Sequence, residues 1–146
     1  MKMISIHSAD ISIESDDLIK VKIFDNIDFE KKDAVELLKA FTDLTAGNKY
    51  YMLTLTNDNF TATSEVREYI AKNISSTGII ANAICIKSLP IRLIVNAYVK
   101  FNKPSIPTKT FNTEAVALEW IDDIRKSEID KANLIKNKNP KKNLMY

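Results

Sequence analysis

The sequence predicts a single α/β domain built as β-β-α-β-α-β-α-β-α, with a mixed, mostly parallel sheet of about five strands and four helices. Apolar and polar residues alternate over 4–13 and 18–23, which is typical of half-buried strands. Two later runs, 50–56 and 79–86, are almost continuously apolar, as expected of strands covered on both faces. A helical pattern follows each strand from 18–23 onward, and this alternation favours parallel strands joined by right-handed crossovers.

The first helix is predicted between the opening strands and the run 50–56. The strands before it form a hairpin that turns at 14–17 and supplies an antiparallel edge to the sheet. Asp28 is a plausible N-cap, and the apolar residues that follow recur at intervals of three and four. Gly47 then suits the left-handed position just past a helix end.

The other helices are predicted in the same way. The second covers about 64–73, and the third begins at Ser88 and runs to about Phe101. A short last strand, 108–111, precedes the fourth helix, which Asn112 or Thr113 caps. The apolar pattern of this helix ends at Ile129, so we place its end there.

The chain has 146 residues, which fits one domain, here placed at 1–129. Residues 130–146 carry five lysines and one acid, and we expect a flexible basic tail. This tail is either simply solvated or makes an electrostatic contact with an acidic partner or a membrane surface. The whole chain carries +2 and the tail +4, so the body carries −2. We therefore expect no nucleic-acid partner.

Residues that usually carry chemistry are scarce. His7 is the only histidine, Cys85 the only cysteine, and the two glycines lie at element boundaries. A histidine-rich metal site, an internal disulfide and a glycine-rich phosphate loop are therefore excluded. We interpret His7 as an ordinary strand residue and Cys85 as a buried apolar residue. We expect no metal, no cofactor and no enzymatic activity.

The same sequence contains no stretch of about 20 apolar residues, the length that a membrane span needs. The N-terminus also lacks the apolar core of a signal peptide. We therefore expect a cytoplasmic protein without a membrane span.

The first candidate site is the polar loop 57–64 with the helix start that follows it. Ligands of open parallel sheets bind beyond the carboxyl ends of the strands, and this loop leaves such an end. Asn57 and Asp58 begin the loop, Thr63 and Ser64 place hydroxyls at a helix N-terminus, and Arg67 follows one turn later. The alternative is that Thr63 or Ser64 only caps the helix.

The second candidate site is formed by Ser88 and Arg92, at the start of the third helix. If the runs 50–56 and 79–86 are neighbouring strands, Arg67 and Arg92 begin adjacent helices at one end of the sheet. Two such arginines would form a modest anion-binding site. The alternative is that each arginine is a surface residue or pairs with a local acid.

Several short motifs carry a resemblance to a known fold. They are 67–69 (Arg-Glu-Tyr), 92–96, 100–104, 107–109, and Phe111 with 117–121. Together with the order of the elements, they resemble the STAS domain, the fold of bacterial anti-sigma-factor antagonists, and the related SEC14-like domains. The chain is more similar still to a group of small bacterial STAS/SEC14-like proteins, over most of residues 3–126.

The resemblance implies a function. STAS antagonists carry a phosphorylatable serine at the start of the helix after the third strand, where this chain has Ser64, our first choice, and Thr63, our second. The Asp-Ser-Gly setting common in that family is absent here. SEC14-like proteins bind lipid.

We therefore expect a non-catalytic regulatory or protein-interaction domain of STAS-like type, with phosphorylation near the start of the second helix as its candidate control. Its protein partner is unknown. The alternative is a small binding module for an anionic or amphipathic ligand. An exposed edge strand of the hairpin makes a homodimer a further expectation.

Overall fold

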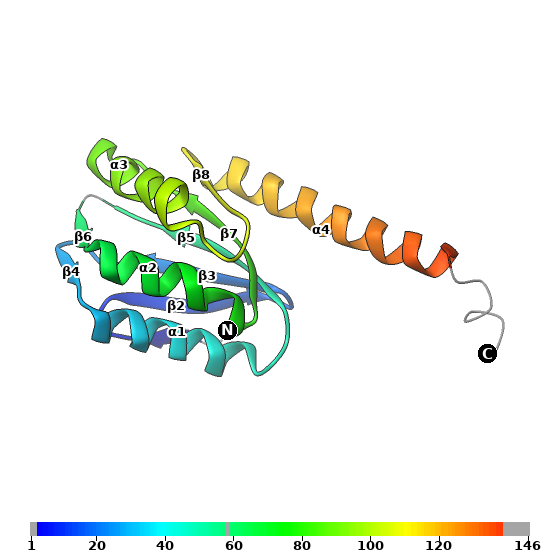
Figure 1. Cartoon of the computed structure of the whole chain (residues 1–146), viewed down its shortest axis with the longest axis horizontal. Coiled ribbons are helices and arrows are strands. Elements are labelled where there is room, and N and C mark those ends of the chain that lie inside the picture. Colours follow the sequence, from blue (N-terminus) through cyan, green and yellow to red (C-terminus); the bar gives the residue numbers. More distant parts are fainter. Residues whose placement is uncertain (1–2, 58, 139–146) are drawn as a thin grey trace.

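The central element of the fold is a six-stranded sheet with helices on both faces (Figure 1). The computed structural model describes residues 3–57 and 59–138. The sheet has the order β1-β2-β3-β5-β7-β8, and its strands are β1 (Met3–Ser5), β2 (Ala9–Ser15), β3 (Leu18–Ile23), β5 (Tyr50–Leu55), β7 (Ile79–Cys85) and β8 (Thr108–Phe111).

The strand directions confirm a mixed, mostly parallel sheet. β1, β2 and β3 pair antiparallel, whereas β3, β5, β7 and β8 pair parallel. The sheet has six strands rather than about five because the first predicted run divides at residues 6–8 into β1 and β2. His7 therefore lies between two strands, and the prediction that it lies within a strand is wrong.

Two very short strands form a separate parallel pair, β4 (Ile27–Phe29) with β6 (Phe60–Ala62). They correct the predicted N-cap of the first helix. Asp28 lies in β4, where its carboxylate accepts a hydrogen bond of 2.6 Å from the Thr61 hydroxyl. Phe29 is buried, so the chain stays extended through this point, and Glu30 caps the helix instead.

The described residues form four α-helices, as predicted. They are α1 (Lys31–Thr45), α2 (Ser64–Asn73), α3 (Leu89–Ala97) and α4 (Glu114–Lys138). A 3₁₀ turn, η1 (Ile74–Thr77), continues α2, and a π-helical turn, η2 (Tyr98–Asn102), continues α3. The predicted start and end of α2 agree with the structure, and α3 with η2 fills the predicted third helix.

The two faces of the sheet are covered by different helices. The strands β3, β5, β7 and β8 follow one another in sequence and in space, and right-handed crossovers then place α1, α2 and α3 on one face. The other face of β5, β7 and β8 packs against α4, where Ala117 and Ile121 are buried against Leu53 and Ala83.

Helix α4 is longer than the sequence predicted. Thr113 caps it by accepting a hydrogen bond from the backbone N–H of Val116, as predicted. The helix does not end at Ile129 but continues to Lys138, and every residue from 126 to 138 is exposed. It extends past the body of the protein (Figure 1). The first part of the predicted tail is therefore helical, and residues 139–146 lie outside the described residues.

Candidate functional site

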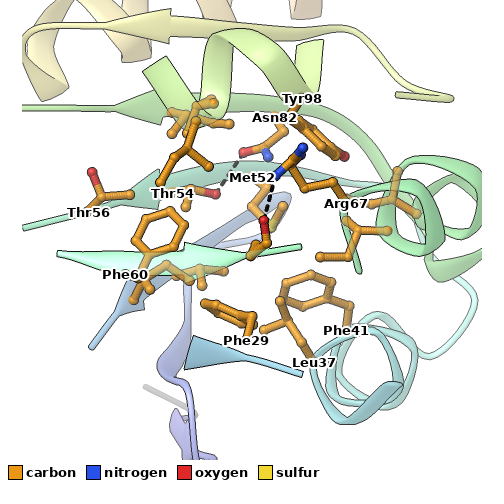
Figure 2. A pocket seen from close by; sticks show the side chains of 18 residues that line it. Phe29, Leu37, Phe41, Met52, Thr54, Thr56, Phe60, Arg67, Asn82 and Tyr98 are labelled. Atoms are coloured by element: carbon orange, nitrogen blue, oxygen red, sulfur yellow. Dashed lines mark hydrogen bonds between the residues drawn. The ribbon is translucent and has the colours of Figure 1, made fainter. Parts of the chain in front are cut away.

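A small apolar cavity lies between the sheet and the helices α1, α2 and α3. Its volume is about 120 Å³. Phe29, Leu37, Phe41, Met52 and Ile74 contribute much of its apolar wall. Figure 2 shows the rings of Phe29 and Phe41 in the lower part of the pocket. The cavity is a region where the core is not completely filled.

Polar groups line the other part of this cavity (Figure 2). The Thr54 hydroxyl on β5 donates a hydrogen bond of 2.8 Å to Asn82 Oδ1 on β7. Thr56 donates a bond of 3.1 Å to the backbone carbonyl of Cys85. The hydroxyl of buried Tyr98 and the Asn82 amide nitrogen make no hydrogen bond within residues 3–57 and 59–138. Burial raises the pKa of Tyr98 well above its usual range, so its hydroxyl stays protonated and can donate.

Arg67 is the charged residue that lines the cavity. It is half-buried in the first turns of α2, and its Nη1 donates a hydrogen bond to the carbonyl of Ala62. Its Nε donates a long bond of 3.4 Å to Asn102 Oδ1 in η2. In the described chain no carboxylate pairs with this guanidinium, and its Nη2 donates no hydrogen bond.

Arg92 lies in a different environment from Arg67. Its Nη2 donates a hydrogen bond of 3.2 Å to the carbonyl of Ile86 and another to the amide oxygen of Asn112. β5 and β7 are neighbouring strands, as the predicted anion site requires. However, Arg92 does not line the cavity, and the two arginines share no partner. The structure therefore does not bring them together on one ligand position.

A second hollow of about 220 Å³ lies at the carboxyl ends of β5 and β7. Predicted Asn57 lines it, together with Lys87, Asn112, Thr113 and Glu114. Ser88 follows Lys87 in the sequence and is half-buried. It is the N-cap of α3 by its backbone conformation, and its side chain makes no capping hydrogen bond. Asp58 lies outside the described residues.

The two candidate phosphorylation sites at the start of α2 differ in their hydrogen bonding. Thr63 is the N-cap, and its hydroxyl accepts a hydrogen bond of 3.3 Å from the backbone N–H of Val66. Ser64 is the first helical residue and is exposed, and its hydroxyl makes no hydrogen bond within the described chain. The capping alternative therefore holds for Thr63.

The outer face of α3 and η2 carries an exposed apolar stripe, which we define as Leu89, Leu93 and Phe101. Their exposed fractions are 67%, 65% and 72%. Leu89 and Leu93 are four residues apart and so lie on one side of the helix. The inner face of the same segment is buried through Ile91, Val95 and Tyr98. The segment therefore carries large apolar side chains on its outer side as well as its inner side.

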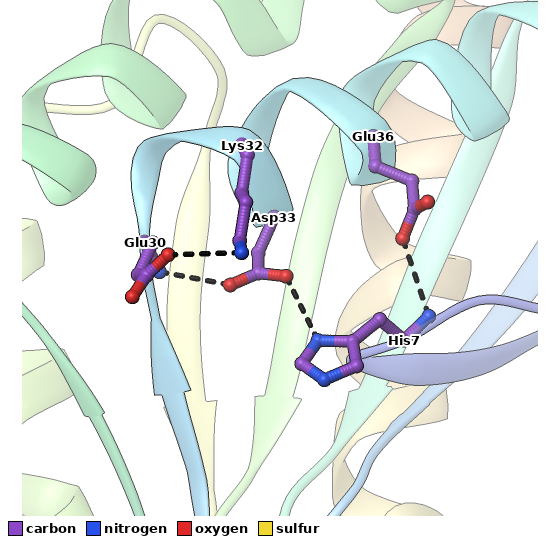
Figure 3. A network of polar contacts seen from close by, with 5 residues as sticks. All are labelled: His7, Glu30, Lys32, Asp33 and Glu36. Carbon is purple, nitrogen blue, oxygen red and sulfur yellow. Dashed lines mark hydrogen bonds and ion pairs between the residues drawn. The ribbon is translucent and has the colours of Figure 1, made fainter.

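His7 and Asp33 form a pair at the start of α1 (Figure 3). His7 Nδ1 lies 2.9 Å from an oxygen of Asp33, whose side chain is 4% exposed. Burial acts to raise the Asp33 pKa, but the backbone N–H of Glu30, which donates to Asp33, and the contact with His7 outweigh it and lower that pKa. The same carboxylate belongs to the capping box of α1. The pair therefore holds β1 and β2 against the helix start.

Cys85 is buried at the end of β7, and burial, with a smaller effect of Glu114, raises the pKa of its thiol. A protonated, buried thiol is a poor nucleophile. Across 3–57 and 59–138, no cluster of three or more His, Cys, Asp or Glu side chains is arranged to hold a metal ion. In the same residues, every helix is too short or too polar to cross a membrane.

Several residues of these surfaces were not among the sequence-predicted candidates. Asn82 is hidden in the apolar run 79–86, and only its polarity within a buried strand marks it. Tyr98 recurs at helical spacing with Ile91, Ile94 and Val95, and this pattern indicates a buried apolar side without marking the hydroxyl. Leu89 and Leu93 do not belong to that buried side, and this was the signal for an exposed apolar surface.

Comparison with curated proteins and with solved structures finds no match. One family model does match, over residues 11–125, and its description is "Domain of unknown function (DUF7793)". The match spans the sheet from β2 to β8, all of α1–α3 and the packed half of α4. The chain therefore belongs to the DUF7793 family.

Proposed function

We propose that this protein is a non-catalytic interaction domain that docks an acidic, amphipathic segment of a protein partner. The docking surface is the outer face of α3 and η2. The exposed apolar stripe carries the proposal, because three large apolar side chains in one segment are each about two-thirds exposed or more. Exposed apolar side chains that gather on one surface are a common feature of interaction sites.

The charge around the stripe supports an acidic partner. Residues 69–113 contain six basic residues and no acidic residue. Lys87, Lys100 and Lys103 are exposed beside or within the segment that carries the stripe. Complementary charges steer a partner and fix its register, while buried apolar side chains supply most of the affinity.

The environments of the histidine and the cysteine support the proposed absence of catalysis. The only histidine contacts Asp33, the N3 residue of the α1 capping box, and the only cysteine is buried with a raised pKa. Both residues serve the fold.

A STAS-like identity is part of this proposal. Three helices on one face of the sheet, a fourth on the other, and an antiparallel hairpin before parallel strands support it. The α2 start supports control by phosphorylation, since exposed Ser64 lies where the helix dipole favours added negative charge. The hydroxyl of Thr63 is engaged as the cap, so Ser64 is the better acceptor.

The test is capture of a partner from an extract of the native cell on immobilised protein. We expect Leu93→Glu to abolish capture, because a carboxylate then stands in the stripe among lysines that recruit acids. Val116→Glu is the matched control, since Val116 is an exposed apolar residue on α4. The proposal is contradicted if Leu93→Glu captures as much partner as Val116→Glu does, or if the wild type captures no partner.

The position and charge of the partner need a second measurement. A carbodiimide joins a lysine directly to a neighbouring carboxylate, so crosslinks from Lys100 or Lys103 to Asp or Glu of the partner are expected. Crosslinks confined to other lysines place the partner elsewhere. For regulation, Ser64→Asp should change the captured amount severalfold, whereas Ser75→Asp, at an exposed serine of η1, should not.

A further inference from the structure

We infer that the cavity beneath α3 binds a compact monocarboxylate, with its apolar body in the cavity and its carboxylate on the Arg67 guanidinium. This site is separate from the proposed docking surface, which is the opposite side of the same helix. Three features of the cavity carry the inference: an unpaired cation, unused hydrogen-bond donors and a limited size.

The cation is the first feature. Arg67 is half-buried and lines the cavity, yet no carboxylate of the described residues forms an ion pair with it. Arg125 provides the contrast, because Asp17 accepts bonds of 2.8 and 2.9 Å from it and Asp122 accepts another. A guanidinium has five N–H donors in a planar fork that matches a carboxylate. Arg67 uses Nε and Nη1 within the fold, and Nη2 is left for a ligand.

The unused donors are the second feature. The Tyr98 hydroxyl and the Asn82 amide nitrogen line the same cavity without a partner in the described part of the protein. Figure 2 shows both in the part of the pocket that also holds Arg67. Neither atom is fully buried, because the one fully buried side-chain polar atom without a partner in the described residues is Ser8 Oγ. Both donors are therefore accessible to a ligand, and a carboxylate accepts several hydrogen bonds at once. These donors therefore suit a ligand that is an acceptor.

The size of the cavity limits the ligand. A buried cavity of about 150 Å³ lined by apolar side chains takes up a molecule of the size of benzene. The present cavity has a volume of about 120 Å³, so the apolar body of its ligand is limited to a small ring or a short branched chain. Phospholipids and long-chain fatty acids exceed this volume several times over.

Entry is available at one side. Phe60, Ala62, Arg67 and Ile94 line the cavity but are half-buried rather than buried. They come from β6, the start of α2 and α3, and so mark where the cavity meets the surface. A carboxylate at Arg67 would lie near this rim and keep contact with water, which lowers the cost of removing its charge from solvent.

The test uses benzoate and hexanoate as probes, with benzyl alcohol and hexanol as neutral partners of the same shape. Binding to the full chain is followed by isothermal calorimetry and by amide chemical shifts of Ala62, Ile84 and Val95. We expect saturable binding of at least one acid, at least tenfold tighter than its alcohol. Palmitate should produce no change at these amides.

Two variants complete the test. Arg67→Met should weaken binding of the acid at least tenfold while leaving the alcohol unchanged. Arg92→Met is the matched control, because it removes the same charge at the same end of the sheet from outside the cavity, and it should bind the acid as the wild type does. Equal binding of acid and alcohol by the wild type, equal loss in both variants, or no shift at the cavity amides overturns the inference. The comparison of acid with alcohol on the wild type decides the question even where a variant does not fold.

Discussion

Val95→Ile should stabilise the protein because it places a methyl group into the cavity. Val95 is buried on the inner face of α3 and lines the cavity. About 120 Å³ of the pocket that Val95 lines is free of protein atoms, so there is room for one more methyl group. Burying one methylene contributes about 0.8 kcal/mol. We expect the free energy of unfolding in urea to rise by about 0.5–1 kcal/mol and Tm to rise by about 1–4 °C.

Val66→Ile is the matched control for this prediction. Val66 is a valine of comparable burial on the neighbouring helix α2, but it does not line the cavity. Adding a methylene where the core is already filled costs about 1–3 kcal/mol. The reasoning is refuted if Val95→Ile destabilises the protein as much as Val66→Ile does, because Val95 would then face no free space. The stabilised variant should also bind benzoate more weakly, since the methyl group occupies its position.

Three further predictions follow from the described contacts. Tyr98→Phe should leave the free energy of unfolding without ligand within about 0.5 kcal/mol of the wild type, because the hydroxyl has no partner in the described residues and is not fully buried, while calorimetry shows weaker binding of the acid. Asp33→Asn should destabilise the protein at neutral pH. Because folding lowers the Asp33 pKa, the carboxylate stabilises the fold above its unfolded pKa near 3.8, and this contribution is lost as pH falls through the lower folded pKa. Urea titrations should therefore show that the difference in stability between wild type and variant shrinks in acid. A chain that ends at Ile129 should unfold within about 0.5 kcal/mol of the full chain, because residues 130–138 are exposed, and a larger loss would show that the end of α4 packs on something.

The main elements of the fold could be predicted because local patterns and caps point to the same positions. α2 is the best case: Thr63 caps it, and Val66, Tyr69 and Ile70 set its apolar side, so its range follows from sequence alone. By contrast, β4 and β6 have three residues each, too few for an alternating pattern. Their pairing joins residues that are distant in the chain, and it displaces the predicted cap from Asp28 to Glu30.

The candidate site could be predicted only in part, for a similar reason. Arg67 was recognised from its place at a helix start, but its environment depends on Asn102 and Tyr98, which a later segment brings to it. Arg92 has the same sequence context, yet the neighbouring β8 and α4 turn it toward Asn112. Position in a secondary-structure element was readable from the sequence, whereas the partner of each side chain was set by tertiary packing.

The segment of α3 and η2 links the two proposed sites. Val95 and Tyr98 on its inner face line the cavity, and Leu93 and Phe101 on its outer face belong to the apolar stripe. A ligand in the cavity that holds this segment in place would reduce the ordering that partner docking must otherwise impose. Thermodynamic linkage then requires the partner to tighten ligand binding by the same factor. The π-helical turn η2 is the natural place for this coupling, because it begins at Tyr98 and its Asn102 accepts the hydrogen bond from Arg67. Partner affinities measured with and without saturating benzoate, and benzoate affinities measured with and without partner, must therefore change by equal ratios if the two faces act on one segment.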